Sequence, residues 1–166
     1  MDCSPVPSLR SKAWRPLFRD IYVDAQLAVT HRTRCRAARL VFPSGAAVAG
    51  RSAAAPFGVG EVRVDEPIDV LVPTALRRGP VVGLTVHRAG VTGDEIVSYA
   101  GIPVTTPRRT CWDLAQWYPL EDAVATVDRL ASAGVVRLDE VADLARASGG
   151  CRVRRALAPR PGPVPS

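Results

Sequence analysis

Two adjacent arginines at the start of an expected helix give the most specific indication of chemistry, which is either phosphate binding or ion pairing. Thr106 is a suitable N-cap, and Pro107 suits the first helical position. Arg108 and Arg109 then fall in the first turn, where the positive end of the helix dipole disfavours cations. A phosphate held by the helix amides and both arginines would compensate, and so would an ion pair between Arg109 and Asp113. Because Asp113 is already within reach, the sequence favours the ion pair and leaves phosphate binding open.

The residues that common enzyme mechanisms require are sparse in this chain. Lys12 is the only lysine and His31 and His87 are the only histidines, and the sequence has no glycine-rich phosphate loop or nucleophile motif. A zinc site needs ligands in close pairs, whereas the cysteines are far apart. They are Cys3, Cys35, Cys111 and Cys151. We therefore expect no catalytic residue, metal site, cofactor or small-molecule substrate.

Charge is distributed in blocks along the 166 residues, whose formal net charge is +6. Residues 25–60 have five arginines and no acidic residue, and residues 144–166 have the same composition of charges. Residues 61–143, between these blocks, have thirteen acidic residues and eight arginines. Arginine can donate two parallel hydrogen bonds to a phosphate, so the basic blocks make DNA a candidate partner. Genomic base composition would also explain an excess of arginine over lysine.

Hydropathy argues against contact with a membrane. The longest uncharged apolar stretch, residues 40–50, is interrupted by Pro43 and is far shorter than the roughly 20 residues that span a bilayer. The N-terminal residues do not combine a basic segment with the apolar segment of a secretory signal. We expect a cytoplasmic protein with one folded core.

A hairpin and an amphipathic helix are expected in the N-terminal third. Trp14–Phe18 and Ile21–Val23 have the composition of paired strands. Asp24 is a plausible N-cap for a helix over Ala25–Phe42. We expect His31 to be a hydrogen-bonded core residue of that helix. Apolar or buried positions recur on one helical face at Leu27, His31, Cys35, Ala38 and Phe42.

A second face of the same helix has three arginines. Arg32, Arg36 and Arg39 fall within about 60° of one another at helical periodicity, and we call them the arginine stripe. A solvated helix face explains such a pattern, and so does a surface that follows phosphates. With Arg108 and Arg109, these residues are the candidate contacts for nucleic acid or a partner protein.

The remaining sequence alternates short strands and helices. Ser52 is a possible N-cap of a short helix. Helical periodicity returns at Pro107, at Pro119 and near Asp139. These patterns predict an α/β (α+β) fold with a small mixed, mostly antiparallel sheet and flanking helices. The expected strands are Asp69–Val72, Gly83–His87, Glu95–Tyr99 and Ile102–Val104.

Three segments lie in an order and at a spacing typical of a known family. They are WRPLFRDIYV at residues 14–23, RSAA at 51–54 and IPVTTPRRTCWDLA at 102–115. Over about residues 10–158 the chain resembles actinobacterial members of the AbiEi-like (abortive-infection type IV) antitoxin family. The motif residues that we single out are Trp14, Tyr22, Ser52, Thr106, Pro107 and Asp113.

The resemblance implies an N-terminal winged-helix module whose wing is the hairpin, joined to a mixed α/β antitoxin domain. It also implies a transcriptional autorepressor that counters a nucleotidyltransferase-like toxin. We accordingly divide the chain into a loop with a wing-like hairpin remnant at residues 1–24 and an antitoxin-type α/β domain at 25–150. A basic, proline-rich tail, expected to be disordered, follows at 151–166.

Many proteins of similar pattern continue into a very-short-patch-repair-like endonuclease domain. Relative to them we expect this chain to be truncated at both ends. The favoured interpretation is a non-enzymatic antitoxin-like or transcriptional regulator-like protein that binds DNA or a partner, with the toxin or its operon as candidates. The alternative is an orphaned accessory domain of an endonuclease-family protein without its catalytic module.

Overall fold

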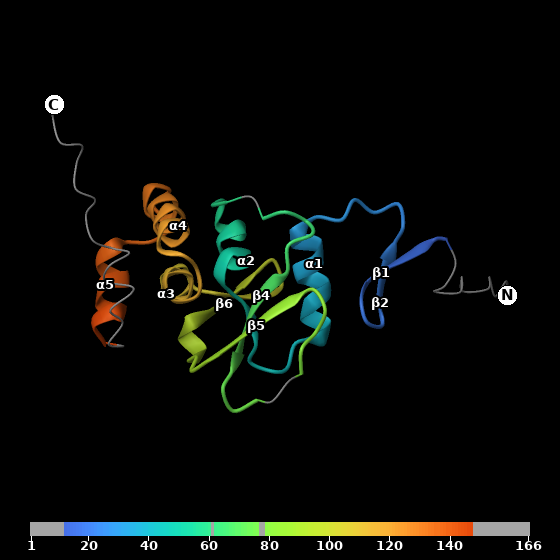
Figure 1. Ribbon diagram of the computed structural model, residues 1–166, viewed down its shortest axis with the longest axis horizontal. Coiled ribbons are helices and arrows are strands. Elements are labelled where there is room, and N and C mark those ends of the chain that lie inside the picture. The colour runs from blue at the N-terminus through green and yellow to red at the C-terminus, as the bar shows by residue number, and fades with distance from the viewer. Residues whose placement is uncertain (1–11, 61, 77–78, 148–166) are drawn as a thin grey trace.

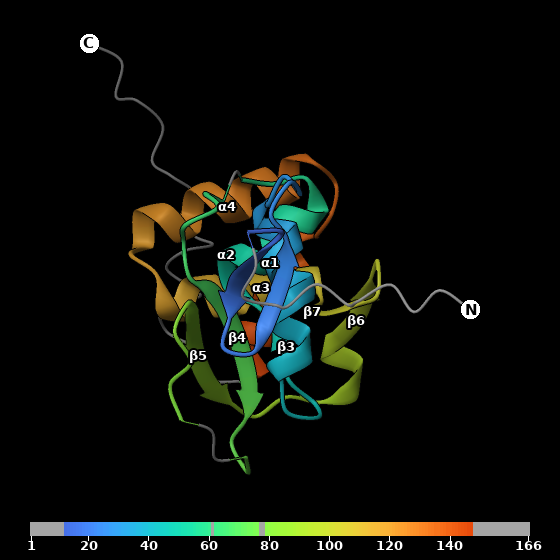
Figure 2. The same cartoon turned by 90° about the vertical axis from the view of Figure 1, so that its right-hand side faces the viewer.

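The computed structural model describes residues 12–60, 62–76 and 79–147. A two-stranded hairpin stands at one end of the molecule, and a five-stranded sheet lies in the middle (Figures 1 and 2). Helices α4 (Leu120–Ser132) and α5 (Leu138–Ala147) lie at the other end. The predicted α+β fold is confirmed.

The predicted N-terminal hairpin is also confirmed. Strand β1 (Trp14–Phe18) pairs antiparallel with β2 (Ile21–Asp24). Phe18 is buried in the same apolar cluster as the sheet, which anchors the hairpin to the rest of the domain. The Arg15 guanidinium donates a hydrogen bond to the Leu27 carbonyl and so ties β1 to the segment after β2.

Helix α1 (His31–Ala38) is shorter than the helix predicted over Ala25–Phe42, and Asp24 is not its N-cap. The Thr30 hydroxyl accepts a hydrogen bond from the Thr33 N–H at 3.1 Å and caps the helix. Aspartate and threonine are both good N-caps, so composition could not distinguish the two starting points.

Because α1 is shorter than predicted, the residues on either side of it do not continue the predicted core face. Leu27 lies before the helix and is 47% exposed, whereas His31 and Cys35 within it are buried as predicted. After the helix, the chain tightens into the 3-10 turn η1 (Arg39–Val41). Phe42 then adopts an extended conformation and packs against the core with only part of its surface.

The central sheet has the strand order β5-β4-β3-β7-β6. Its strands are β3 (Ala47–Val48), β4 (Ile68–Pro73), β5 (Leu84–Ala89), β6 (Ile96–Tyr99) and β7 (Ile102–Thr105). Strands β3 and β4 pair antiparallel, as do β6 and β7, whereas β4 and β5, and β3 and β7, pair parallel. The mixed sheet is confirmed, but antiparallel pairs do not predominate. The connection from β4 to β5 returns the chain to the same end of the sheet instead of forming a hairpin.

Strand β3 and helix α2 occupy the stretch in which the sequence predicted one short helix with Ser52 as a possible N-cap. Helix α2 (Gly50–Ala54) has Ala49 as its N-cap and continues as the 3-10 turn η2 (Ala55–Phe57). The prediction of Ser52 as N-cap is therefore wrong, because Ser52 lies inside α2. Its hydroxyl instead forms hydrogen bonds to α1 and β4.

The helices after the sheet follow the predicted order. Helix α3 (Pro107–Trp117) has Thr106 as its N-cap, as predicted. Helices α4 and α5 both contact α3. Leu114, Val127 and Leu130 are fully buried in the apolar cluster that the three helices form.

The two faces of the sheet have different partners. Alternation along β4 places Ile68, Val70 and Val72 in the apolar cluster beneath α1. Asp69 points to the other face, where it meets Tyr118 at the end of α3. Helix α1 and helix α3 therefore lie on opposite sides of the sheet (Figure 1).

Within residues 12–60, 62–76 and 79–147, no helix has the length and apolarity that spanning a membrane requires. Cys3, Cys151 and the tail predicted at 151–166 lie outside the described residues.

Candidate functional site

The arginine stripe lies on the surface of α1 and η1. Arg32, Arg36 and Arg39 are all exposed. Among the described residues, Arg36 and Arg39 have no ion pair, and the Arg32 guanidinium lies over the ring of Tyr99. The stripe therefore presents three cations whose charges no neighbouring carboxylate neutralises.

Helix α1 holds the stripe in a fixed position. His31, Cys35 and Ala38 are buried beneath the helix, so rotation of α1 about its axis would expose them. Arg34, outside the stripe, donates hydrogen bonds to the Val64 carbonyl and, at 2.7 Å, to the Glu66 carbonyl. Arg34 thus fastens α1 to the loop before β4 and leaves the stripe arginines free to contact other molecules.

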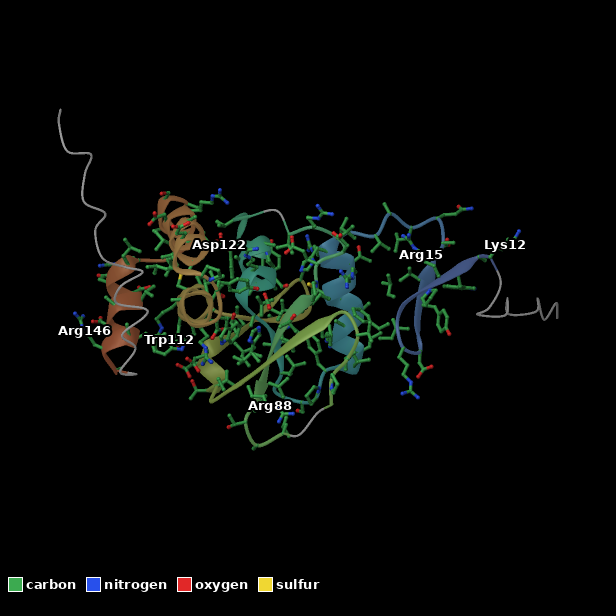
Figure 3. The ribbon with its side chains drawn as sticks, viewed as in Figure 1. Lys12, Arg15, Arg88, Trp112, Asp122 and Arg146 are labelled. Atoms are coloured by element: carbon green, nitrogen blue, oxygen red, sulfur yellow. The ribbon has the colours of Figure 1, made fainter. Side chains whose placement is uncertain are left out.

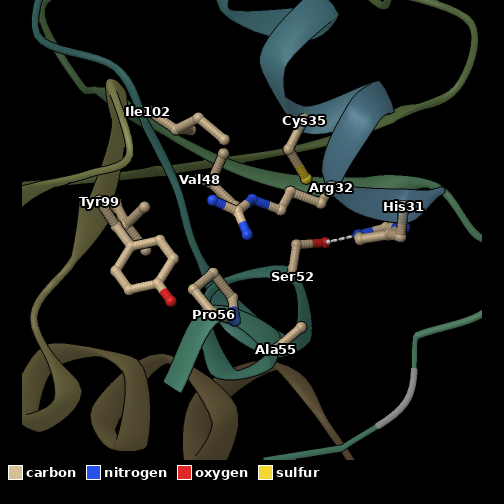
Figure 4. A pocket seen from close by; sticks show the side chains of 10 residues that line it. His31, Arg32, Cys35, Val48, Ser52, Ala55, Pro56, Tyr99 and Ile102 are labelled. Atoms are coloured by element: carbon tan, nitrogen blue, oxygen red, sulfur yellow. Dashed lines mark hydrogen bonds between the residues drawn. The ribbon is translucent and has the colours of Figure 1, made fainter. Parts of the chain in front are cut away.

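A pocket of about 150 Å³ lies beside the stripe, between α1, α2 and the β7–β6 edge of the sheet (Figure 4). Val48, Ile102 and Val104 form apolar parts of its lining, and Tyr99 closes one side. The Arg32 guanidinium carbon is 5.6 Å from the centroid of the Tyr99 ring, within the range of a cation–π contact.

A buried hydroxyl lies across the pocket from the tyrosine. Ser52 Oγ is 2.9 Å from His31 Nε2 and accepts a hydrogen bond from the Asp69 N–H at 3.1 Å. Burial, with a smaller effect of Arg34, lowers the pKa of His31, so the imidazole is neutral at pH 7. Burial also raises the pKa of the Cys35 thiol to about 12. This thiol is therefore protonated and is not a nucleophile at neutral pH.

A second polar cluster surrounds Asp69, on the opposite face of the sheet. The carboxylate accepts hydrogen bonds from the Arg51 N–H at 3.2 Å and from the Tyr118 hydroxyl, and it lies 3.1 Å from His87 Nε2. The His87 ring stacks on the Trp117 ring, with centroids 3.5 Å apart. Because Asp69 is only 4% exposed, the cluster fixes α2, β5 and α3 against β4.

Sequence reasoning missed both Tyr99 and Asp69. Asp69 lies within the otherwise apolar run Ile-Asp-Val-Leu-Val, and a carboxylate in a buried strand needs hydrogen-bond donors. That pattern could have revealed Asp69. Tyr99 has no comparable signal, because an aromatic residue in a short strand is ordinary.

The first-turn arginines of α3 lie in different environments. Arg109 is 4% exposed, and its Nε donates to Asp113 Oδ1 at 2.8 Å, so the predicted ion pair is confirmed. Its Nη1 donates to Glu95 Oε2 at 2.8 Å and to the Gly90 carbonyl at 2.9 Å. Arg108 is only partly buried. That Arg108 and Arg109 contact nucleic acid or a partner protein stays a prediction. Arg109 itself lies in the domain interior.

The Asp113 carboxyl is expected to make stability depend on pH. Burial raises its pKa to about 7, because the cost of desolvation exceeds the effect of Arg109. The unfolded chain releases this proton at pH about 4, so the folded state holds it more tightly between these values. This contribution to stability is present at low pH and is lost as pH rises towards 7.

Denaturant unfolding from pH 5 to pH 8 tests this sign. The parent should lose stability relative to the Asp113→Asn variant as pH rises. Other titrating groups, including Glu95, are present in both proteins, so the comparison isolates Asp113. A difference that stays constant or changes in the opposite direction would contradict the expectation.

The remaining motif residues position structural elements. Thr106 and Pro107 start α3, while Trp14 and Tyr22 lie partly buried in the hairpin. Because α1 and α3 lie on opposite sides of the sheet, the structure does not bring the arginine stripe together with Arg108 (Figure 1).

Other charged side chains are spread along the molecule. They extend from Lys12 and Arg15 at the hairpin to Arg146 in α5 (Figure 3). In the part of the chain that the structure describes, no group of three or more histidine, cysteine or acidic side chains could hold a metal ion.

The sheet, its helices and the exposed cationic helix define a small α+β domain with a basic surface. The family model for the AbiEi antitoxin C-terminal domain matches residues 46–158, more than half of the chain, and the protein belongs to this family. The match begins after α1, so the hairpin and the arginine stripe precede it.

A solved structure shares this fold. The crystal structure of the RV2827C protein from Mycobacterium tuberculosis aligns with a TM-score of 0.51 and 19% sequence identity. The alignment covers 82% of this chain and 60% of that one. No curated protein matches the sequence.

Proposed function

We propose that the protein is an antitoxin-type regulator of a toxin–antitoxin system and that it binds DNA rather than catalysing a reaction. Membership of the antitoxin family supports the assignment to a toxin–antitoxin system. The observation that supports DNA binding is the arginine stripe, a row of exposed cations without carboxylate partners on a helix fixed by its buried face. Such a surface matches the charge of a phosphate backbone.

The stripe is better suited to phosphates than the basic tail. Neighbouring arginines on one helical face lie about 5 to 6 Å apart, so they lose little freedom when they meet phosphates. The sequence predicts a proline-rich tail, whose arginines would have to be ordered at a cost of about 1 to 2 kcal/mol per residue. Per contact, the stripe should therefore bind more strongly than Arg152, Arg154 and Arg155.

Duplex binding is expected to be electrostatic and weakly selective for sequence. If three to five arginines meet phosphates, log K should fall with log salt at a slope of about −3 to −4.5. Replacing Arg32, Arg36 and Arg39 together with glutamate should remove at least about 2.7 units of that slope, because each phosphate contact contributes about 0.9. Fluorescence anisotropy at several salt concentrations measures both quantities.

A matched variant controls for net charge. Arg129, Arg137 and Arg146 are also exposed but lie on or beside α4 and α5. Their replacement with glutamate changes the net charge equally and should leave most of the binding. Absence of binding by the parent at low salt would contradict DNA binding. If deletion of the residues after Gly150 abolishes DNA binding while reversal of the stripe leaves it unchanged, the stripe is not the DNA-binding surface.

The antitoxin role has a separate test. Coexpression with a nucleotidyltransferase-like toxin encoded beside the gene should relieve growth inhibition by that toxin. Relief that persists after reversal of the arginine stripe would show that neutralisation does not depend on the DNA-binding surface.

A further inference from the structure

The pocket beside Arg32 has room for one six-membered ring. Its volume is about 150 Å³. An apolar cavity of about this volume accepts benzene, whereas pockets for drug-sized ligands start at about 300 Å³. A complete nucleotide is too large for this pocket, but a single pyrimidine base is of suitable size.

The walls of the pocket suit a flat, mostly apolar group. The Tyr99 ring is held from one side by an edge contact with Phe57, at a centroid distance of 6.2 Å and an interplanar angle of 65°. Val48 and Val104 are almost completely buried and belong to rigid strands. Stacking of a base on an aromatic side chain is the common way in which proteins bind unpaired nucleotides.

Arg32 already shows that a planar cation can lie over Tyr99. Its guanidinium extends into the pocket between the Tyr99 ring and Ser52 (Figure 4). The volume of about 150 Å³ is the space that remains with Arg32 in this position, so a base can enter without displacing the guanidinium. The base would then contact the planar guanidinium as well as the Tyr99 ring, one helical turn from Arg36.

The polar side of the pocket offers little to distinguish one base from another. Ser52 Oγ accepts from the Asp69 N–H and can direct its own hydrogen to His31 Nε2. The hydroxyl then keeps one lone pair and no donor for a ligand. Recognition would therefore depend on ring size and stacking more than on the hydrogen-bonding edge of the base.

We propose that this pocket takes up one unpaired pyrimidine base from a nucleic-acid strand whose phosphates lie along the arginine stripe. The inference rests on the proposed function, because the stripe must first bind the strand. It adds a preference for unpaired nucleotides that a stripe of cations alone would not produce.

The test compares two DNA probes at equal salt. One is a fully paired duplex, and the other is the same duplex with a single unpaired thymidine. The parent should bind the second probe at least about fivefold more tightly, since stacking of one base contributes a factor of this size or more. A probe with an unpaired adenosine should gain less, because a purine exceeds the pocket.

Two variants alter the pocket without removing a stripe arginine. Tyr99→Leu removes the stacking surface, and Ala55→Leu fills the space from η2. Both should abolish the preference for the unpaired base. Ala55→Leu should also leave duplex affinity unchanged, whereas Tyr99→Leu additionally removes the cation–π partner of Arg32. Tyr22→Leu, an equivalent change in the hairpin, should keep the preference. Circular dichroism confirms that each variant folds.

The outcomes separate the two proposals. Equal affinity of the parent for both probes, or a preference that survives in both pocket variants, would overturn the pocket assignment and leave DNA binding by the stripe intact. If the parent binds neither probe, both proposals would be overturned. Reversal of the arginine stripe should weaken binding to both probes together.

Discussion

Replacement of Asp113 with alanine is expected to lower the free energy of unfolding by about 3 kcal/mol, which is typical when one partner of a buried ion pair is removed. Arg109 is 4% exposed and would lose the carboxylate that accepts from its Nε at 2.8 Å. Glu95 would remain as a partner at 2.8 Å, which places the expected loss at the lower end of the usual range. Chemical denaturation measures this change.

A matched exposed pair provides the control. Asp143 accepts from Arg146 on the surface of α5, and such pairs contribute about 0 to 1 kcal/mol. Asp143→Ala should therefore change stability much less than Asp113→Ala. Equal losses would show that burial of the Arg109–Asp113 pair has no special consequence.

Magnesium distinguishes a structural role of Asp113 from a metal-binding one. Thermal melts of the parent and of Asp113→Ala should respond equally to added magnesium. A stabilisation by magnesium that is present in the parent and absent from the variant would contradict the structural role.

Replacement of Gly50 with alanine is expected to cost about 2 to 5 kcal/mol. Gly50 has a φ of +52°, and a left-handed conformation costs a residue with a Cβ about 1 to 2 kcal/mol. The new Cβ would also lie 2.8 Å from Asp69 Oδ2. That carboxylate cannot retreat without breaking its hydrogen bonds, so overpacking adds about 1 to 3 kcal/mol.

Gly58 allows the two causes to be separated. It has a φ of +77°, but a Cβ built there meets no atom within 4 Å. Gly58→Ala should therefore show only the cost of the backbone conformation, and the excess loss in Gly50→Ala measures the contact with Asp69. Thermal and denaturant unfolding of both variants provide the comparison. Similar losses in the two would mean that the carboxylate moves freely.

Local chemistry predicted the elements whose signals lie close together in sequence. Thr106 begins α3 because its hydroxyl caps the helix, and Asp113 is four residues from Arg109, so their pairing follows from helical geometry. The hairpin and four strands were likewise marked by strand composition between turn residues. For the candidate site, the same helical periodicity placed the arginine stripe on an exposed face.

Such local signals do not predict contacts between segments that are far apart in the sequence. The pocket needs Tyr99 from β6 and Ser52 from α2 on opposite sides of Arg32, and no periodicity relates these three positions. Strand β3 has only two residues and small side chains, so its composition does not distinguish it from a loop. The start of α1 depended on whether Asp24 or Thr30 caps the helix, and Thr30 is the cap.

The position of β3 also has a consequence for the order of folding. This two-residue strand joins the halves of the sheet, since Val48 pairs with Val70 on one side and with Val104 on the other. Both pairings close long stretches of chain, and the entropy of that closure must be paid before the central hydrogen bonds form. Helices α3, α4 and α5 are consecutive, and α3 contacts both of the others. We therefore expect the helical end to collapse first and the sheet to close last, which makes sheet closure the slow step.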